Sequence, residues 1–318
     1  MRVRVALFAV LIAALPSAAR AQACEFLTQD RVWHLLGDCQ TDQSIEIPED
    51  IVRFDGGGHV IVAVDTPGRP FRGGVVVARS RQASVVNTRV STLLTTNSCV
   101  GGDALLRGIY FDGASGEISN NTVRAISRGS AACEEGNGIE VRNRDRDGAP
   151  TIVVIHDNHV DEYQKTGIVV HGNVEATIES NVIGSSVAHP IITPNGIQIG
   201  PQASARLRNN QIAGNFTGAA ASGPAGAAII LTESGPGTIV DRNLIEGDED
   251  IGIRVSADGA TITDNVVRDL GGSERSDEIG IVNEGTGNVI LNNTVTGFRT
   301  SYFGVDPPSP ASRGLQIE

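Results

Sequence analysis

Four side chains in the middle of the chain have the types that proton transfer on an acidic sugar requires: Arg142, Tyr163, Lys165 and His171. Cleavage of a uronate polymer by β-elimination needs a cation to neutralise the sugar carboxylate, a base to remove the C5 proton and an acid to protonate the leaving oxygen. Arg142 can pair with a carboxylate through two hydrogen bonds. Lys165 or His171 can be the base, and Tyr163 can be the acid. Lys165 is the only lysine of the chain, against 24 arginines.

Two repeated units reveal the elements that must position these residues. The first unit, Gly-Ile-x-apolar, has copies from Gly108 to Gly196 that lie 29 or 30 residues apart. The second unit has the form apolar-x-x-Asn-x-apolar. Its asparagines are Asn121, Asn158, Asn181, Asn210, Asn243, Asn265 and Asn293. Short runs of Val and Ile that are punctuated by Gly and Asn predict strands rather than helices.

A repeat of this length that is built from strands predicts a solenoid. A leucine-rich repeat has a similar period, but it needs a leucine-dominated consensus and a long amphipathic return, whereas here Ile and Val dominate and the return is another strand. We predict an all-β fold, a single-stranded right-handed parallel β-helix of about ten coils with inward Ile and Val forming a continuous core. The repeated asparagines should stack as a side-chain ladder at turns, in left-handed backbone. The glycines of the Gly-Ile units are interpreted as turn residues.

The chain divides into four expected segments. Residues 1–23 predict a signal peptide, because two arginines precede an apolar run and small residues, with cleavage after Ala21 or Ala23. Residues 24–60 are the expected N-terminal cap and first coil, and residues 61–305 the β-helix. Residues 306–318 form a tail whose prolines cannot extend a strand ladder. The expected location is secreted or periplasmic, and no second apolar run is long enough to span a membrane.

The cysteines Cys24, Cys39, Cys99 and Cys133 are even in number, which predicts disulfides in an exported protein. Three pairings are possible, and we favour the local ones, Cys24–Cys39 and Cys99–Cys133. No Cys-x-x-Cys occurs, which argues against a zinc or redox site, and no residue is assigned as a metal ligand.

No cofactor is expected, and calcium is the one alternative. The run Asn143-x-Asp145-x-Asp147-Gly148 resembles the first half of a calcium loop. Its twelfth position is Val154, where a complete loop needs a glutamate. The acidic run 247–250 is interpreted as a solvated loop.

The formal charge of −12 and the aromatic content of 4% exclude some partners. Nucleic acid is not expected, because phosphate contacts need a basic surface. Negative charge also repels polyuronates, except at a local basic patch. The expected partner is a polysaccharide or a cell-envelope glycan, and the expected state is a monomer.

The segment Phe54-Asp-Gly-Gly-Gly-His-Val-Ile61, together with the Asn-x-Val/Ile repeats, resembles secreted bacterial right-handed β-helix repeat proteins of the pectate-lyase-like superfamily. Segments 138–143, 163–168 and 195–199 are similar to exported bacterial β-helix proteins without an assigned activity. The resemblance covers most of the chain and implies the fold. It implies no single activity, because the superfamily includes lyases, hydrolases, epimerases and non-enzymes. The chain lacks the Asp-Pro-His-Glu/Asp segment of alginate epimerases and the clustered calcium-binding aspartates of pectate lyases, so those catalytic residues are not carried over.

Stacked coils would bring the candidate residues together on an outer face. If Ile139 and Val141 point inward, Glu140 and Arg142 point outward, and His171 lies beside Arg142 on the next coil. Tyr163 and Lys165 share that face if the chain there is extended. The expected catalytic set is Lys165, Tyr163, His171 and Arg142. The expected substrate-binding set is Glu140, Gln198, Asn137, Asn195 and Tyr110.

Two functional hypotheses follow. The first is an exported protein that binds a polysaccharide, with a lyase-like site on the face of residues 134–200. Whether the chain is an enzyme is left open, but a lyase is favoured over a glycoside hydrolase. A hydrolase needs two carboxylates across one bond, for which Glu140 with Asp112 or Glu134 is the weaker fit. The second hypothesis is a non-catalytic surface, structural or adhesion protein, because solenoids usually have polar outer faces.

Overall fold

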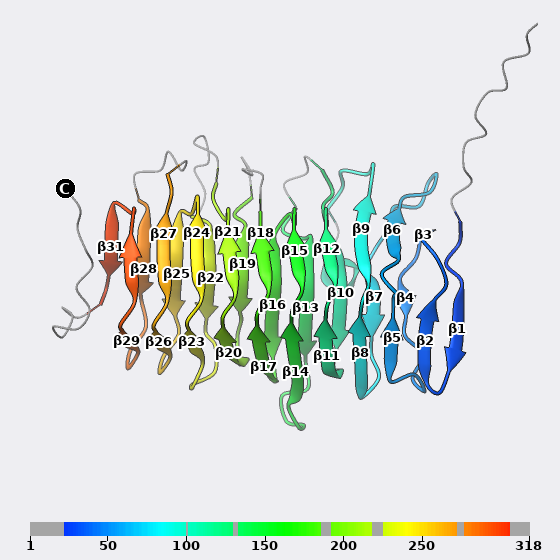
Figure 1. Cartoon of the computed structure of the whole chain (residues 1–318), viewed down its shortest axis with the longest axis horizontal. Helices are drawn as coiled ribbons and strands as arrows, with labels where there is room; N and C mark the ends of the chain where they lie inside the picture. The colour runs from blue at the N-terminus through cyan, green and yellow to red at the C-terminus, as the bar shows by residue number, and fades with distance from the viewer. Residues whose placement is uncertain are drawn as a thin grey trace, which may run out of the picture.

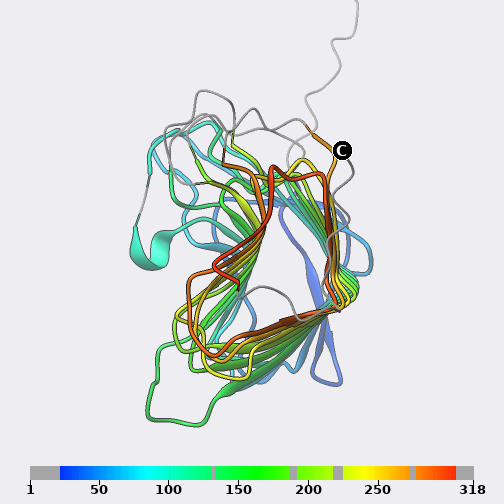
Figure 2. The ribbon, with the colours of Figure 1, turned by 90° about the vertical axis from the view of Figure 1, so that its left-hand side faces the viewer.

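The computed structural model describes residues 22–99, 101–129, 133–185, 192–217, 225–271 and 277–305. These residues form a rod of three long sheets, with the chain running from one end to the other (Figure 1). Viewed along the rod, the sheets are the walls of one tube (Figure 2). Every strand pair is parallel except β1 (Phe26–Gln29) with β2 (Val32–Leu35), which form an antiparallel hairpin at the N-terminal end of one sheet.

The chain passes through sheets I, II and III in turn, once in each coil. Within the described residues, the strands of sheet I are, in spatial order, β4 (Ile45–Glu46), β7 (Gly74–Ala78), β10 (Arg107–Asp112), β13 (Asn137–Asn143), β16 (Thr166–Gly172), β19 (Asn195–Ile199), β22 (Ala227–Thr232), β25 (Ile251–Ser256), β28 (Ile279–Asn283) and β31 (Thr300–Phe303). Those of sheet II are β1 (Phe26–Gln29), β2 (Val32–Leu35), β5 (Arg53–Asp55), β8 (Gln82–Val86), β11 (Ser115–Ser119), β14 (Thr151–His156), β17 (Val174–Glu179), β20 (Ser204–Arg208), β23 (Ile239–Asp241), β26 (Thr261–Thr263) and β29 (Val289–Leu291). Those of sheet III are β3 (Cys39–Thr41), β6 (Val60–Val64), β9 (Arg89–Leu93), β12 (Thr122–Arg124), β15 (His159–Asp161), β18 (Val182–Gly184), β21 (Gln211–Ala213), β24 (Leu244–Gly247), β27 (Val266–Asp269) and β30 (Thr294–Thr296).

The core is a stack of equivalent apolar residues, as predicted for a parallel β-helix. Ile139 pairs with Ile168, which pairs with Ile197, and all three are fully buried. The predicted fold class is therefore confirmed. The short 3-10 helix η1 (Gly102–Ala104) lies in the segment that leads into β10.

The predicted asparagine ladder is confirmed between sheets II and III. The side-chain nitrogen of Asn158 donates to Oδ1 of Asn181 at 3.0 Å, and Asn181 donates to Asn210 at 2.9 Å. The same contact joins each neighbouring pair from Asn121 to Asn293. The expected left-handed backbone is wrong for the ladder residues, since the preceding residue adopts it, as at Ser180 with φ 57°. That residue turns the chain, so the asparagine can point inward.

The interpretation of the Gly-Ile glycines as turn residues is wrong. They lie inside the strands of sheet I, where neighbouring coils approach closely. A Cβ atom on Gly138 would lie 2.4 Å from Val160 Cγ1 and 2.7 Å from the carbonyl oxygen of Gly167. These glycines are required by close packing, against a sheet III side chain of the same coil and the backbone of the next coil, rather than by a left-handed turn.

Both favoured disulfides are confirmed. Cys24 is bonded to Cys39 beside the β1–β2 hairpin, and Cys99 to Cys133 beside the start of β13. Residues 1–21 of the expected signal peptide and the tail 306–318 lie outside the described residues. No helix in the described part of the chain has the length and apolar character to cross a membrane.

The acidic run 247–250 is not a solvated loop, because Glu249 and Asp250 are fully buried. The backbone N–H of Asn215 donates to Glu249 at 3.1 Å, and that of Thr217 donates to Asp250 at 3.0 Å. Burial raises the pKa of Glu249 well above its usual value. These carboxyl groups hold the backbone of the preceding coil by accepting its N–H groups.

We predict that Asn181→Ala destabilises the rod by about 3 kcal/mol, because it leaves buried donors and acceptors of two coils without partners. Asn181 accepts from the backbone N–H of Asn158 and donates to the carbonyl oxygen of Ile155, both at 3.0 Å. Urea unfolding measures the loss. Gln211→Ala removes an exposed amide from sheet III and should change the free energy of unfolding by less than about 0.5 kcal/mol. Equal effects of the two variants would contradict a stabilising role for the ladder.

Candidate functional site

The strand register places the key outward residues of sheet I side by side, as predicted. Arg142 of β13 pairs with His171 of β16, and Glu140 pairs with Val169. Ile139 and Val141 point into the core. Glu140 and Arg142 are nevertheless buried, with 2% and 8% of each residue's surface exposed. At these two residues, the interpretation as an ordinary solvated face is therefore wrong.

Two adjoining hollows lie over β13 and β16, and we call them together the groove. The first has a volume of about 250 Å³, and its lining residues include Lys165, Glu140 and Gln198. The second has a volume of about 390 Å³ and is lined by Arg142, Asn143, Arg144, Arg146, His171, Gly172, Pro201 and Gln202. Arg142, His171 and Pro201 line both. The groove therefore follows the strands, from Lys165 just before β16 to the turn after β13.

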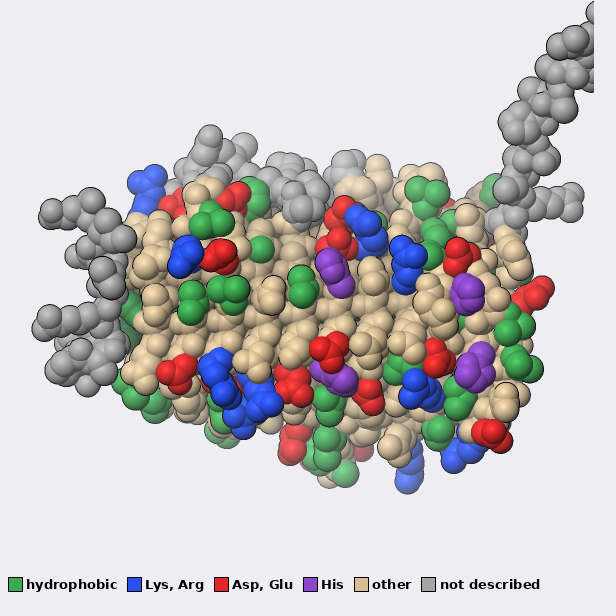
Figure 3. Space-filling view, in the orientation of Figure 1, with side chains coloured by type: hydrophobic (Ala, Val, Ile, Leu, Met, Phe, Trp, Pro, Cys, Tyr) green, Lys and Arg blue, Asp and Glu red, His purple; other side chains and the backbone are tan. Residues whose placement is uncertain are grey.

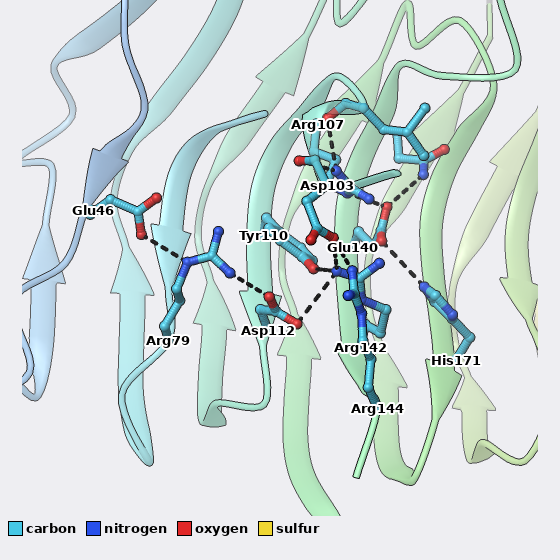
Figure 4. A network of polar contacts seen from close by, with 12 residues as sticks. Glu46, Arg79, Asp103, Arg107, Tyr110, Asp112, Glu140, Arg142, Arg144 and His171 are labelled. Atoms are coloured by element: carbon cyan, nitrogen blue, oxygen red, sulfur yellow. Dashed lines mark hydrogen bonds and ion pairs between the residues drawn. The ribbon is translucent and has the colours of Figure 1, made fainter. Parts of the chain in front are cut away.

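Glu140 is the centre of the polar network in the groove (Figure 4). Its Oε2 atom accepts hydrogen bonds from Arg107 Nε at 2.6 Å and Asn137 Nδ2 at 2.8 Å. Its Oε1 atom lies 3.2 Å from Nε2 of His171. Burial raises the pKa of Glu140, but the hydrogen bonds from His171, Arg107 and Asn137 and the charge of Arg107 outweigh it and lower the pKa to about 2. Glu140 is therefore a carboxylate that orients the His171 ring.

Arg142 is held between acidic groups and an aromatic ring. Its Nη2 atom lies 2.9 Å from Oδ1 of Asp103 and 3.5 Å from Oδ1 of Asp112, and it also donates to the Tyr110 hydroxyl. Its guanidinium carbon lies 5.2 Å from the centre of the Tyr110 ring. These contacts fix the guanidinium at the boundary of the two hollows.

Lys165 lies in the first hollow with its side chain 20% exposed. Its Nζ atom donates to the carbonyl oxygen of Thr193 at 3.2 Å and forms an ion pair with Glu134. The sole lysine is therefore close to His171 in the groove but already has two protein partners.

Residues 137–305 match the family model described as the right handed beta helix region. This match covers more than half of the chain. The protein belongs to the right-handed β-helix family. A search of curated proteins found no match.

In this β-helix protein, the structure corrects three of the predicted site residues. Tyr163 is fully buried, its hydroxyl donates to Asn215, and burial raises its pKa well above the usual value. It points into the rod, so it does not share the face of Lys165 and His171. Tyr110 is covered by Arg79, Arg107 and Arg142, and Asn195 is buried outside both hollows.

Sequence reasoning missed several residues of the groove. Arg107 pairs with Asn137 in register, so its place just before a Gly-Ile unit was the available signal. Arg144 and Arg146 lie in the seven-residue turn between β13 and β14, whereas a single residue joins β16 to β17. An insertion at an otherwise short turn is a signal for a functional loop.

The turn that resembled half a calcium loop uses its oxygens internally. Asn143 Oδ1 accepts the N–H of Asp145 at 2.9 Å, and Asp145 Oδ1 accepts the N–H of Gly148 at 3.1 Å. Asn173 of the next coil donates to the carbonyl oxygens of Asp145 and Gly148 at 3.0 and 2.9 Å. The turn therefore presents Arg144 and Arg146 from an ordered backbone.

We predict that Glu140 contributes stability that is lost in acid. Because its pKa is about 2 in the folded state against a usual 4.5, the contribution is present above pH 4.5 and disappears as the pH falls toward 2. This difference corresponds to about 3 kcal/mol. Urea unfolding between pH 7 and pH 3 should show a smaller loss of stability in Glu140→Gln than in the wild type, although the variant starts less stable because Arg107 loses its buried partner.

Glu175→Gln removes an exposed carboxylate from β17 and serves as the control. It should keep the pH dependence of the wild type. An unchanged pH dependence in Glu140→Gln would contradict this role of Glu140.

Proposed function

We propose that this β-helix protein binds an acidic polysaccharide in the groove. The observation that supports this most directly is the second hollow, whose lining includes Arg142, Arg144, Arg146 and His171 and, among the described residues, no carboxylate side chain. The chain as a whole has a formal charge of −12. A local basic surface on an acidic protein attracts an anionic ligand to that one place.

The groove has the shape and chemistry for a chain of sugars rather than a single small anion. It follows β13, whose seven residues span about 20 Å. The first hollow offers Gln198, Asn137 and Lys165 for hydrogen bonds to hydroxyl groups. The second offers guanidinium groups, which suit planar carboxylates. By contrast, the face of sheets II and III carries charges of both signs among uncharged side chains (Figure 3).

The proposal also covers the cellular location and the oligomeric state of the protein. Two disulfides suit an oxidising compartment, and the resemblance to secreted pectate-lyase-like proteins points the same way. We infer that the protein is exported, through cleavage of the N-terminal segment, and meets its ligand as a monomer at the cell surface or outside the cell.

We predict that Arg146→Gln weakens binding to polygalacturonate about fivefold, the effect of an exposed ion pair of about 1 kcal/mol. Arg146 has no ion pair or side-chain hydrogen bond in the part of the chain that the structure describes, so the substitution should leave the melting temperature unchanged. Isothermal titration calorimetry at low salt measures the affinity. Arg89→Gln removes an exposed arginine from β9 on sheet III and should bind like the wild type. Equal weakening by both variants, or no binding by the wild type, would reject the groove as the binding site.

A second candidate function is cleavage of the same polymer by β-elimination. The observation that favours it is the contact between His171 and the buried carboxylate of Glu140, because catalytic bases are commonly oriented by such a third group. His171 would take the C5 proton, the bond from C4 to the leaving oxygen would break, and the Lys165 ammonium would protonate that oxygen. The observation against it is that Arg107, Arg142, Arg144 and Lys165 already have acidic partners, so none of these four is unpaired and available to neutralise the sugar carboxylate or to protonate the leaving oxygen.

Ultraviolet absorbance of the unsaturated uronate product distinguishes these functions. If the protein is a lyase, His171→Ala should lower the rate at least about 100-fold, the usual contribution of a general base. Lys165→Ala should lower the rate as well, because it removes the proposed acid. Activity that persists in His171→Ala would reject this mechanism. Binding by the wild type without any product would assign the groove to binding alone.

A further inference from the structure

One carboxylate of the protein already lies against the arginines of the groove. Asp103, on η1, contacts Nη2 of Arg142 at 2.9 Å through Oδ1, and the same oxygen forms an ion pair with Nη2 of Arg144 (Figure 4). The side chains of Asp103 and Arg144 remain 60% and 55% exposed. A carboxylate that bridges two guanidinium groups makes the contact that a uronate carboxylate would make.

The two arginines do not depend equally on Asp103. Arg142 keeps Tyr110 and Asp112 as partners if Asp103 moves away, so its guanidinium stays in place. Arg144 has Asp103 as its only ion-pair partner among the described residues. Removal of this carboxylate would therefore leave one fixed and one unpaired guanidinium in the lining of the second hollow.

The contact is exchangeable. The pair of Asp103 with Arg144 is exposed at both ends, and such pairs contribute little to stability. In the contact with Arg142 the carboxylate is the exposed partner, so an incoming carboxylate can replace Asp103 without uncovering the buried arginine. The backbone of η1 need not move, because the main chain beside it is anchored independently. Arg107 donates to the carbonyl oxygen of Leu105 at 2.8 Å, and Glu135 accepts the N–H of Leu106 at 2.8 Å. Rotation of the Asp103 side chain is sufficient.

We propose that Arg142 and Arg144 form a carboxylate subsite, that Asp103 occupies it in the ligand-free protein, and that a sugar carboxylate displaces Asp103 on binding. This inference rests on the proposed polysaccharide binding and adds an internal competitor to it. The competitor favours ligands with several carboxylates, since a single weak anion gains little by replacing one carboxylate with another.

The test compares Asp103→Asn with Asp147→Asn in calorimetric titrations with polygalacturonate. Both variants remove one exposed carboxylate near the groove, but Asp147 contacts neither arginine among the described residues. Asp103→Asn should bind about fivefold more tightly than the wild type, in line with an exposed ion pair. Asp147→Asn should show at most a small gain. Equal gains would mean that general electrostatics is responsible, and weaker binding by Asp103→Asn would mean that Asp103 positions the arginines; either result overturns the inference.

A double variant tests whether the gain in affinity of Asp103→Asn depends on Arg144. In an Arg144→Gln background, Asp103→Asn should gain less affinity than it does alone, because the two substitutions act on the same subsite. A full, additive gain would overturn the subsite assignment. Failure of the proposed function is distinguishable: if the wild type and every variant fail to bind, both proposals fall, whereas wild-type binding that Asp103→Asn leaves unchanged rejects the internal competitor alone.

Discussion

Parallel hydrogen bonding between coils sets a spacing of about 4.8 Å, and the rest of the structure depends on it. At this spacing a buried amide on one coil can reach the same amide on the next, which is why asparagine recurs between sheets II and III. At the start of the sheet I strands, a side chain on Gly138 or its equivalents would clash both with an apolar side chain of sheet III in the same coil and with the backbone of the next coil. Isoleucines such as Ile139 and Ile168 then stack in the core. One repeated distance thus selects glycine, asparagine and isoleucine at their separate places.

The outer face of sheet I obeys the same register, but its chemistry is not repetitive. Glu140 and Arg142 lie on neighbouring outward positions of β13 and are buried by their contacts with Arg107, Asp103 and Tyr110. A buried carboxylate is costly unless charged and polar partners surround it. Arg107, Asn137 and His171 supply them. In the groove, the repeated strands therefore carry charged side chains that do not recur from coil to coil and that are paired with groups of opposite charge or with hydrogen-bond donors. Such a departure from the repeat is expected where residues serve a purpose other than the fold.

The internal pairing of the groove cations also bears on what the site does. A lyase needs cations that are available to the substrate, whereas most cations of the groove form ion pairs within the protein. Some of these ion pairs are buried and others are exposed to solvent. The pair of Arg107 with Glu140 is buried, while the contacts of Arg144 with Asp103 and of Lys165 with Glu134 are partly solvated. Buried pairs maintain the shape of the groove, and exposed pairs can exchange with a ligand. This division separates the residues that build the site from those that can bind.

The sequence by itself determined the fold, because a repeat of 29 residues in Val, Ile, Gly and Asn admits few other architectures. It also determined that Arg142 and His171 are neighbours, since residues one period apart must stack. Tertiary structure alone decided which side Tyr163 faces, because the residues just before a strand follow the turn rather than the alternation of the strand. The tertiary structure alone also decided which residues contact Arg142 and Glu140. Asp103 reaches Arg142 from η1, which lies in a turn that the repeat does not govern. Arg107 reaches Glu140 from the first residue of β10, where the period predicts its position but not its partner.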